Sequence, residues 1–193
     1  MDTSQMQAND DTTYRFRDHD GLEIRVRPET PADAAYLVDL FGHLGPTSRY
    51  LRFSKVMDDP DPARVRAEAE RLAQLGPPRD MAWLAFADRP DRASVPVAGG
   101  RYTPSESGPV ELSVVVRDDM QRQGIGSRLL YFVLDQARAD GVGEARTSFE
   151  SGNEAAWHVL QYSPYHITWQ PCGKQIEVMI HLQARTSPSA SLN

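Results

Sequence analysis

The segment VELSVVVRDDMQRQGIGSRLL, which spans Val110–Leu130, carries the strongest structural pattern in the chain. Its first half is rich in β-branched valines and ends before two aspartates, which is typical of a largely buried strand. Its second half begins a helix, because the apolar residues after the turn recur at helical spacing: Ile125, Leu129, Phe132, Val133 and Ala137. The two elements meet at Gln121-x-x-Gly124-x-Gly126, so the sequence predicts a strand, a glycine-rich turn and a helix in direct succession.

The two glycines of this turn indicate a binding site for phosphate groups. Gly124 and Gly126 lack a Cβ, so the backbone can approach a ligand closely. The first turn of a helix presents unpaired N–H groups and the positive end of the helix dipole, which favour a pyrophosphate. A P-loop would require Gly-Lys-Ser/Thr, which is absent, and a dinucleotide fingerprint would require a glycine in place of Leu129. A tight turn with incidental glycines is the competing interpretation.

The pattern resembles motif A of the GNAT acetyltransferase superfamily, Gln/Arg-x-x-Gly-x-Gly/Ala after a strand, at Gln121, Gly124 and Gly126. The resemblance implies that the turn binds the pyrophosphate of acetyl-CoA. It also implies a bulge in the strand, which frees main-chain groups at Val114 and Val116 for the pantetheine arm. Arg122 or Arg128 would pair with phosphate or remain solvated. The expected cofactor-binding residues are Val114, Val115, Val116, Gln121, Arg122, Gln123, Gly124, Ile125, Gly126, Ser127, Arg128 and Asn153.

Composition indicates a globular protein. The chain has 193 residues, of which 40% are hydrophobic and 25% charged, enough for one domain with a sizeable core. We expect a cytoplasmic protein, because the sequence contains no long apolar run, no signal-peptide pattern and one cysteine, Cys172. The net charge of −6 disfavours nucleic-acid binding and suits a cationic amine substrate.

The rest of the chain predicts an α/β domain with a mixed, mostly antiparallel sheet flanked by helices. We expect a disordered tail over residues 1–19, one GNAT domain over 20–183, and a flexible tail over 184–193. Apolar patterning and turn signals predict strands at 22–27, 81–87, 95–102, 110–116, 144–150, 167–170 and 176–182. Helix signals predict helices from Thr30 to Gly45, over 47–53, from Asp61 to about Leu75, after Gly124, and over 153–161. This order is the GNAT topology.

A second resemblance lies at Ser48-Arg49-Tyr50-Leu51-Arg52-Phe53. It is similar to a serine-containing stretch that ends in Tyr-x-Arg-Phe in bacterial GNAT domains of the protein-lysine acetyltransferase type. In that family the first helices cover the acceptor groove, so Arg49 and Tyr50 are expected to contact the amine substrate. The alternative is that Tyr50 and its apolar neighbours belong to the core.

Glu111 is the candidate catalytic base. A lysine-type amine has a pKa of about 10.4, so only about one molecule in a thousand is neutral near pH 7.4. A positioned carboxylate therefore has to help remove the proton. The lysine-acetyltransferase-like GNAT domains place a base glutamate at the position of Glu111, and its apolar neighbours favour partial burial. The alternative is a solvated glutamate at a strand edge.

The residue expected to act as general acid departs from the family pattern. GNAT enzymes often have an asparagine at the position of Asn153, and seven residues later a tyrosine that protonates the departing thiolate. Leu160 stands at that position here, with Tyr162 and Tyr165 as the nearby substitutes. Asn153 has an equally good interpretation as a helix N-cap.

No pattern predicts a metal site or a covalent nucleophile. His19 lies between two aspartates but within the expected tail, the Asp58–Asp61 run is typical of a helix start, and Cys172 lies in an expected turn. The leading hypothesis is an N-acetyltransferase that passes acetyl directly from acetyl-CoA to the primary amine of a protein lysine or a small molecule. The alternatives are a non-catalytic acyl-CoA-binding module and a structural domain without a ligand. Neither a nucleic acid nor a membrane is expected as a partner, and the closing hairpin would offer an edge for a homodimer.

Overall fold

The computed structural model describes residues 14–89, 92–105 and 108–183. The helices are α1 (Ala34–Gly42), α2 (Pro46–Phe53), α3 (Pro62–Ala73), α4 (Ile125–Ala139) and α5 (Glu154–Gln161), with short 3-10 turns at Pro31–Asp33 and Asp118–Met120. The strands are β1 (Tyr14–Arg17), β2 (Glu23–Pro28), β3 (Met81–Arg89), β4 (Arg92–Thr103), β5 (Val110–Val116), β6 (Glu144–Glu150), β7 (His166–Cys172) and β8 (Gln175–His181).

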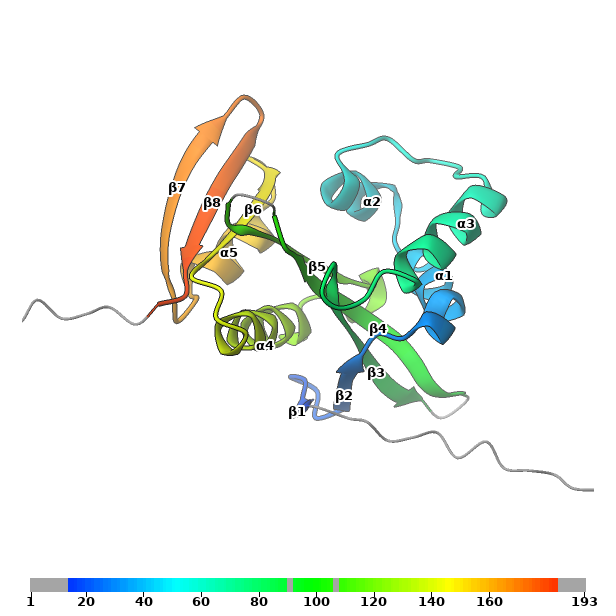
Figure 1. The fold of residues 1–193 in the computed structure, drawn as a ribbon. Coiled ribbons are helices and arrows are strands. Elements are labelled where there is room, and N and C mark those ends of the chain that lie inside the picture. Colours follow the sequence, from blue (N-terminus) through cyan, green and yellow to red (C-terminus); the bar gives the residue numbers. More distant parts are fainter. Residues whose placement is uncertain (1–13, 90–91, 106–107, 184–193) are drawn as a thin grey trace, which may run out of the picture.

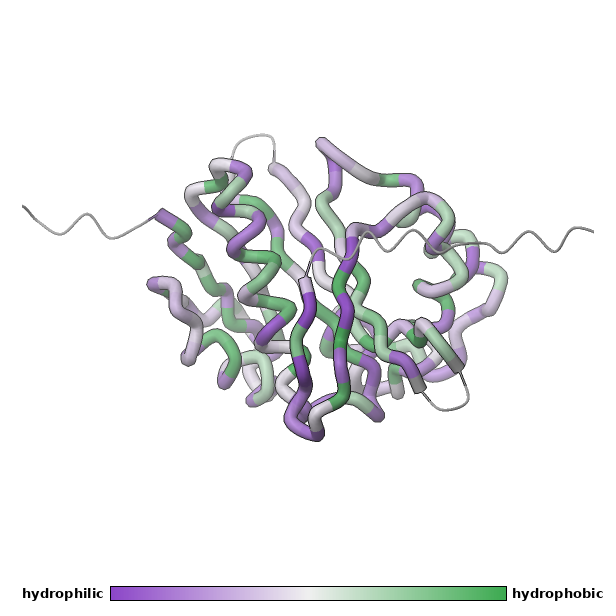
Figure 2. The backbone as a smooth tube through the Cα atoms, turned by 90° about the horizontal axis from the view of Figure 1, so that it is seen from below, coloured by the Kyte–Doolittle hydropathy of each residue, from purple (hydrophilic) through white to green (hydrophobic). Residues whose placement is uncertain are grey.

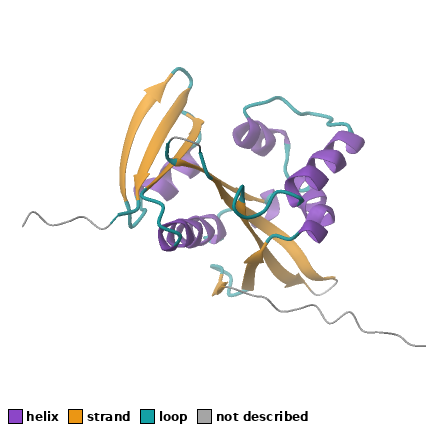
Figure 3. Ribbon diagram, viewed as in Figure 1, coloured by secondary structure: helices purple, strands orange, loops and turns teal. Residues whose placement is uncertain are grey.

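All the strands belong to a single sheet with the order β1-β2-β3-β4-β5-β6-β8-β7. Every neighbouring pair is antiparallel except β5 and β6, which are parallel. Helices α4 and α5 lie on one side of the sheet, and α1, α2 and α3 lie on the other (Figures 1 and 3). The predicted mixed, mostly antiparallel α/β fold is confirmed.

The parallel pair is short, and this opens the centre of the sheet. Residues 110 and 111 of β5 face Ala145 and Arg146 of β6, and beyond them the two strands separate (Figure 1). On its other edge β5 follows β4 in continuous register, from Glu111 opposite Thr103 to Val116 opposite Ala98. The expected bulge in β5 is therefore wrong. The outer edge of β5 is freed because β6 diverges, and this explains why Val114–Val116 remain partly exposed in the middle of the sheet.

The main core lies between the sheet and α4. Helix α4 buries the stripe predicted from the sequence, with Ile125, Leu129, Val133 and Ala137 almost inaccessible to solvent. Gly100 on β4 allows this close packing, because a Cβ there would lie 2.9 Å from a methyl group of Val133. Hydrophobic and hydrophilic residues alternate along the chain where one face of an element is buried (Figure 2).

The opposite face of the sheet carries a smaller core. Leu40 of α1 packs there against Leu84, Phe86 and Val115. This helical region begins after Thr30, as the sequence predicts. Asp33 accepts a hydrogen bond from the N–H of Thr30 at 2.7 Å, which is one half of a capping box. Asp61 likewise caps α3 by accepting from the N–H of Ala63 at 2.9 Å.

The N-terminal boundary differs from the expectation. Tyr14–Arg17 form strand β1 and pair with β2, although the sequence predicts a disordered tail through residue 19. Alternating residues explain the strand, because Phe16 enters the main core and Tyr14 stacks on Phe132 of α4. The earlier part of the expected tail and the tail over 184–193 lie outside the described residues. Within the described ranges, no helix is long and apolar enough to span a membrane.

Candidate functional site

The turn between β5 and α4 leaves the N-terminus of α4 open. Gly124 is the N-cap residue, in the left-handed conformation with φ 78°, and no side chain caps the helix. The N–H of Arg128 donates to the Gly124 carbonyl, but the N–H groups of Ile125, Gly126 and Ser127 precede the first helical hydrogen bond. Three backbone donors and the positive end of a four-turn helix therefore converge where an anion can be held.

The two glycines of the turn have different surroundings. A Cβ on Gly126 would meet one methyl group of Val116 at 3.4 Å, so the protein itself leaves room for a Cβ there. A Cβ on Gly124 would lie 2.6 Å from His19 Nε2. His19 also donates its backbone N–H to the carbonyl of Gln123 at 3.0 Å. Although the sequence places His19 in the expected tail, the structure places it against the turn.

The side chain of Gln121 connects the turn to β5 and to α2. Its Nε2 lies within hydrogen-bond distance of Val116 O (3.1 Å), Asp118 Oδ1 (3.1 Å) and Ser48 Oγ on α2 (3.2 Å). Asp118 adds a second link, because it accepts from the N–H of Gly45 at 2.9 Å. The first residue of the Ser48–Phe53 match thus contacts the first residue of the glycine-rich pattern, which joins α2 to the turn.

Among the other residues expected around the turn, Arg122 and Arg128 are exposed, Gln123 and Ser127 are partly buried, and Ile125 is buried. Arg122 adopts a left-handed backbone with φ 64°. The Arg128 guanidinium lies 5.8 Å from the ring centroid of Phe16. Ile125 is fully buried in the core, so it contributes its backbone N–H and no side chain to a ligand. Two exposed cations beside an open helix N-terminus favour an anion electrostatically.

Glu111 lies at the point where β5 and β6 separate. Arg146, its partner across the parallel pair, donates from Nε and from a terminal nitrogen to Glu111 Oε1, the Nε bond being 2.9 Å long. No described residue bonds to Oε2, which leaves that oxygen open to water or an amine. The expected partial burial is wrong, since the Glu111 side chain is 53% exposed. Its apolar neighbours in sequence face the opposite side of the strand.

The side chains of Glu111 and Ser113 point to the same face of β5, the face that α2 covers. Arg52 of α2 donates to Ser113 Oγ at 2.9 Å. Beside Ser113 on β4 lies Arg101, which forms ion pairs with Glu29 at 3.0 Å and with Asp80 at 3.1 Å. Burial raises the pKa of Glu29 above its ordinary value in spite of Arg101. This face therefore carries a cluster of partly buried acidic and basic side chains that lie close to one another.

Arg49 and Tyr50 do not join this cluster through any described contact. The Arg49 guanidinium lies 4.7 Å from the centroid of the Phe41 ring and donates to the carbonyl of Met57 at 3.2 Å. It lines an open cavity of about 660 Å³ between α1, α2 and α3. Tyr50 is partly buried on α2. Arg52, which occupies the arginine position of the same motif, is the residue that reaches β5, whereas the candidate Arg49 occupies a variable position of the motif.

The residues considered around α5 are engaged elsewhere. Asn153 Oδ1 accepts from the N–H of Ala156 at 3.0 Å, so it acts as the N-cap of α5. Leu160 is buried in the main core. Tyr165 donates its hydroxyl to Asp135 on α4, and Tyr162 is exposed beside His158. Neither of the two nearby tyrosines therefore takes the place of Leu160 in the described contacts.

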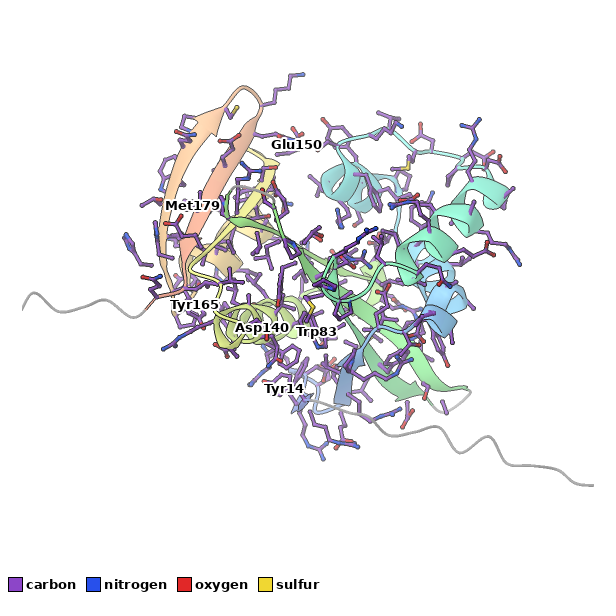
Figure 4. All side chains as sticks on the ribbon, viewed as in Figure 1. Tyr14, Trp83, Asp140, Glu150, Tyr165 and Met179 are labelled. Atoms are coloured by element: carbon purple, nitrogen blue, oxygen red, sulfur yellow. The ribbon has the colours of Figure 1, made fainter. Side chains whose placement is uncertain are left out.

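Hydrogen bonds through Gln175 join the end of α2 to β8 and β6. Gln175 of β8 donates to Ser54 Oγ at the end of α2 (2.9 Å) and lies 3.3 Å from Glu150 Oε1 on β6. Glu150 stands at the end of β6 that faces α2 (Figure 4). No described carboxylate of this site has a metal-binding geometry with its neighbours, since no group of three potential ligands occurs among the described residues.

Comparisons with known proteins agree on the family. Residues 50–162, more than half of the chain, match the model of the family described as "Acetyltransferase (GNAT) family". A Pseudomonas aeruginosa L-methionine sulfoximine/L-methionine sulfone acetyltransferase is 42% identical over 59 residues, which is 30% of this chain. The aligned segment spans about a third of that relative, 34% of its length.

Solved structures agree on the fold. The GNAT domain of PAT from S. lividans has a TM-score of 0.74 at 20% identity, covering 87% of this chain and 96% of that domain. The yncA protein of Salmonella typhimurium, solved with its cofactor acetyl-CoA, has a TM-score of 0.59 at 20% identity, covering 86% of this chain and 98% of that protein.

Proposed function

The chain belongs to the GNAT acetyltransferase family, and from this premise we propose that it transfers acetyl from acetyl-CoA directly to a primary amine. The observation that supports the proposal most is the junction of β5 and α4. There the outer edge of β5, freed by the divergence of β6, leads into a turn whose following helix has an uncapped N-terminus. One cofactor can use both features, because acetyl-CoA has an extended amide-containing arm and a pyrophosphate.

In the proposed complex the pyrophosphate lies on the N–H groups at the start of α4, with Arg122 and Arg128 beside it. The pantetheine arm runs along Val114–Val116 and pairs with the free strand edge as an added strand would. Gln121 holds the turn in place through its bonds to β5 and α2, which is a positioning role. Gly126 leaves the backbone accessible to the phosphates.

The acceptor approaches from the face that α2 covers. Its nitrogen attacks the thioester carbonyl carbon, the new C–N bond forms, and the C–S bond then breaks to release the CoA thiolate. The amine must lose one proton, and in this proposal Glu111 Oε2 accepts it directly or through one water. At pH 7.4 that deprotonation costs a lysine-type amine about 4 kcal/mol. Arg146 positions Glu111 by holding its other oxygen.

A second candidate function is favoured by Leu160. The core leucine stands where the family often has the tyrosine that protonates the thiolate, so a domain that binds acetyl-CoA without turnover is the alternative. Calorimetric titration with acetyl-CoA followed by thiol release over a panel of primary amines separates the two. Binding with release on at least one amine supports the enzyme, and binding without release on any amine supports the module.

Two resemblances point to two different classes of acceptor. The named substrates of the Pseudomonas relative are small amino-acid derivatives, whereas the resemblance at Ser48–Phe53 is to protein-lysine acetyltransferases. The amine panel therefore includes free amino acids, polyamines and lysine-containing peptides.

A further inference from the structure

Arg52 is the feature of the acceptor face that the proposed reaction does not use. It extends from α2 to β5 and donates to Ser113 Oγ, a neutral partner, at 2.9 Å. Phe53 lies under its guanidinium, 5.1 Å from the ring centroid. One of its five N–H donors is thus used by Ser113, and the planar fork retains further donors.

The carboxylates around Arg52 are already paired with other arginines. Arg101 holds Glu29 and Asp80, and Thr103 also donates to Asp80 at 2.9 Å. Among the described residues, no carboxylate lies within ion-pair distance of Arg52. Burial, and next the charge of Arg101, lower the pKa of Arg52, so its surroundings disfavour its positive charge.

An arginine stays charged in proteins, so a partly buried guanidinium without a counterion is unfavourable. The fork of donors matches a carboxylate in geometry and charge, and such a bidentate pair is among the stronger polar contacts. A carboxylate supplied by the substrate would therefore provide the counterion and the hydrogen-bond acceptors that Arg52 lacks among the described residues.

The position of Arg52 fixes where on the substrate that carboxylate has to be. Ser113, its anchor, follows Glu111 by two residues on the same face of β5, a spacing of about 7 Å along the strand. An amine at Glu111 and a carboxylate at Arg52 then belong to one small molecule. This face carries arginines, Arg52, Arg101 and Arg146, as well as carboxylates, Glu29, Asp80 and Glu111, so groups of both signs are available to a zwitterion.

We propose that the acetyl acceptor is an amino acid whose carboxylate is bound by Arg52 while its amine faces Glu111. The inference rests on the proposed acetyltransferase function and specifies its substrate class. Arg52 is a specificity-determining residue in this account, and Ser113 positions it. Polyamines and other amines without a carboxylate would leave Arg52 unpaired and would be poor acceptors.

The test compares the twenty L-amino acids with their carboxamides in a thiol-release assay with saturating acetyl-CoA. The carboxamides keep the amine and lose only the negative charge. We expect at least one amino acid to be acetylated, with kcat/KM at least 100-fold above that of its carboxamide. Arg52→Gln should lower kcat/KM for the acid by at least 100-fold through KM, change the carboxamide rate less than threefold, and leave acetyl-CoA affinity unchanged.

Two further variants keep this test decisive. Arg52→Lys retains the charge without the fork and should recover part of the lost kcat/KM, whereas Arg64→Gln removes an exposed arginine on α3 and should change nothing. If Arg52 only ties α2 to β5, Arg52→Gln lowers the unfolding temperature and slows acids and carboxamides equally, which overturns the proposal. If Arg52→Gln does not fold, the wild-type comparison tests the preference for a carboxylate, and Arg52→Lys tests whether the arginine fork binds it.

The outcomes also separate this inference from its premise. Acetylation of amines with no preference for acids over carboxamides overturns the amino-acid proposal and leaves the acetyltransferase function intact. Absence of acetyl-CoA binding overturns the proposed function itself.

Discussion

The imidazole of His19 lies against the α-carbon of Gly124, so close that a Cβ on Gly124 would lie 2.6 Å from His19 Nε2. The turn between β1 and β2 therefore supports the glycine-rich turn, and the backbone bond from His19 to Gln123 fixes the contact. Gly124 thus has two separate reasons to be glycine, its positive φ and this neighbour.

These two reasons predict that Gly124→Ala destabilises the fold more than an equivalent change elsewhere. The left-handed backbone costs an alanine about 1 kcal/mol, and the clash with His19 adds to that. Gly141→Ala is the matched control, because Gly141 has φ 83° and no atom within 4 Å of its missing Cβ. Urea unfolding should show the larger loss for Gly124→Ala.

The clash itself is tested by removing His19. We expect His19→Ala to restore part of the lost stability in the Gly124→Ala background and to be nearly neutral alone. Equal losses for Gly124→Ala and Gly141→Ala, with strictly additive effects of His19→Ala, would show that the contact carries no energy.

Replacing Glu111 by glutamine tests the proposed base. The variant keeps the shape and the hydrogen bonds to Arg146 but cannot accept the amine proton, so kcat should fall by roughly 10²–10⁴. Higher pH should partly restore the rate, because more of the amine is then neutral without help. Acetyl-CoA affinity should change less than threefold, since the strand edge and the turn bind the cofactor.

Glu144→Gln is the control for this experiment, because Glu144 lies on β6 and pairs with His181 at 3.0 Å, outside the proposed site. A Glu111→Gln enzyme within threefold of the wild-type kcat at pH 7 would exclude Glu111 as the base. Glu150, on the same face near Gln175, would then be the next residue to replace.

Asp33 is predicted to govern part of the acid stability of the fold. Burial opposes its ionisation, but two 2.7 Å bonds from Arg27 outweigh that and hold the pKa of Asp33 below its ordinary value of 3.8. A lowered folded-state pKa stabilises the protein above the unfolded pKa, and this contribution is lost as pH falls through the folded value. Asp33→Asn should therefore cost about 3 kcal/mol at pH 7.

The same variant should flatten the loss of stability below about pH 4, because the amide that replaces the carboxylate does not titrate. Glu68→Gln provides the comparison: its partner Arg71 also lowers the pKa of Glu68, but the pair is exposed and should contribute less than about 1 kcal/mol. Equal effects of the two substitutions at pH 7 would contradict the role of burial at Asp33.

Most of the fold follows from local patterns in the sequence. The stripe from Ile125 to Ala137 fixes the buried face of α4, and caps such as Asp61 fix helix starts, because these signals lie within one or two turns of chain. Strand β1 could not be predicted in this way, because its burial depends on Phe132, more than a hundred residues away. A four-residue strand carries little pattern of its own.

The candidate site could likewise be predicted only where its residues are close together in the sequence. Gly124, Gly126 and Gln121 could be identified from spacing, because the turn is contiguous in sequence. The partners of Glu111 and Ser113 could not, since Arg146 and Arg52 arrive from β6 and α2 through the sheet register. Arg52 occupies the arginine position of the motif and Arg49 a variable one, but only the packing of α2 shows that Arg52 faces β5.

Calorimetric titration of acetyl-CoA into wild-type protein and Gly126→Val tests the central claim most directly. A side chain at Gly126 meets one Val116 methyl at 3.4 Å but would occlude the proposed pyrophosphate site, so Gly126→Ala offers the milder version if valine disturbs packing. Gly42→Ala, with open space at the end of α1, is the control. The account predicts saturable one-to-one binding that is at least tenfold weaker, about 1.4 kcal/mol, in the folded Gly126 variants and unchanged in Gly42→Ala. Equal affinity in wild type and a folded Gly126→Val protein, or no binding to wild type, would contradict it.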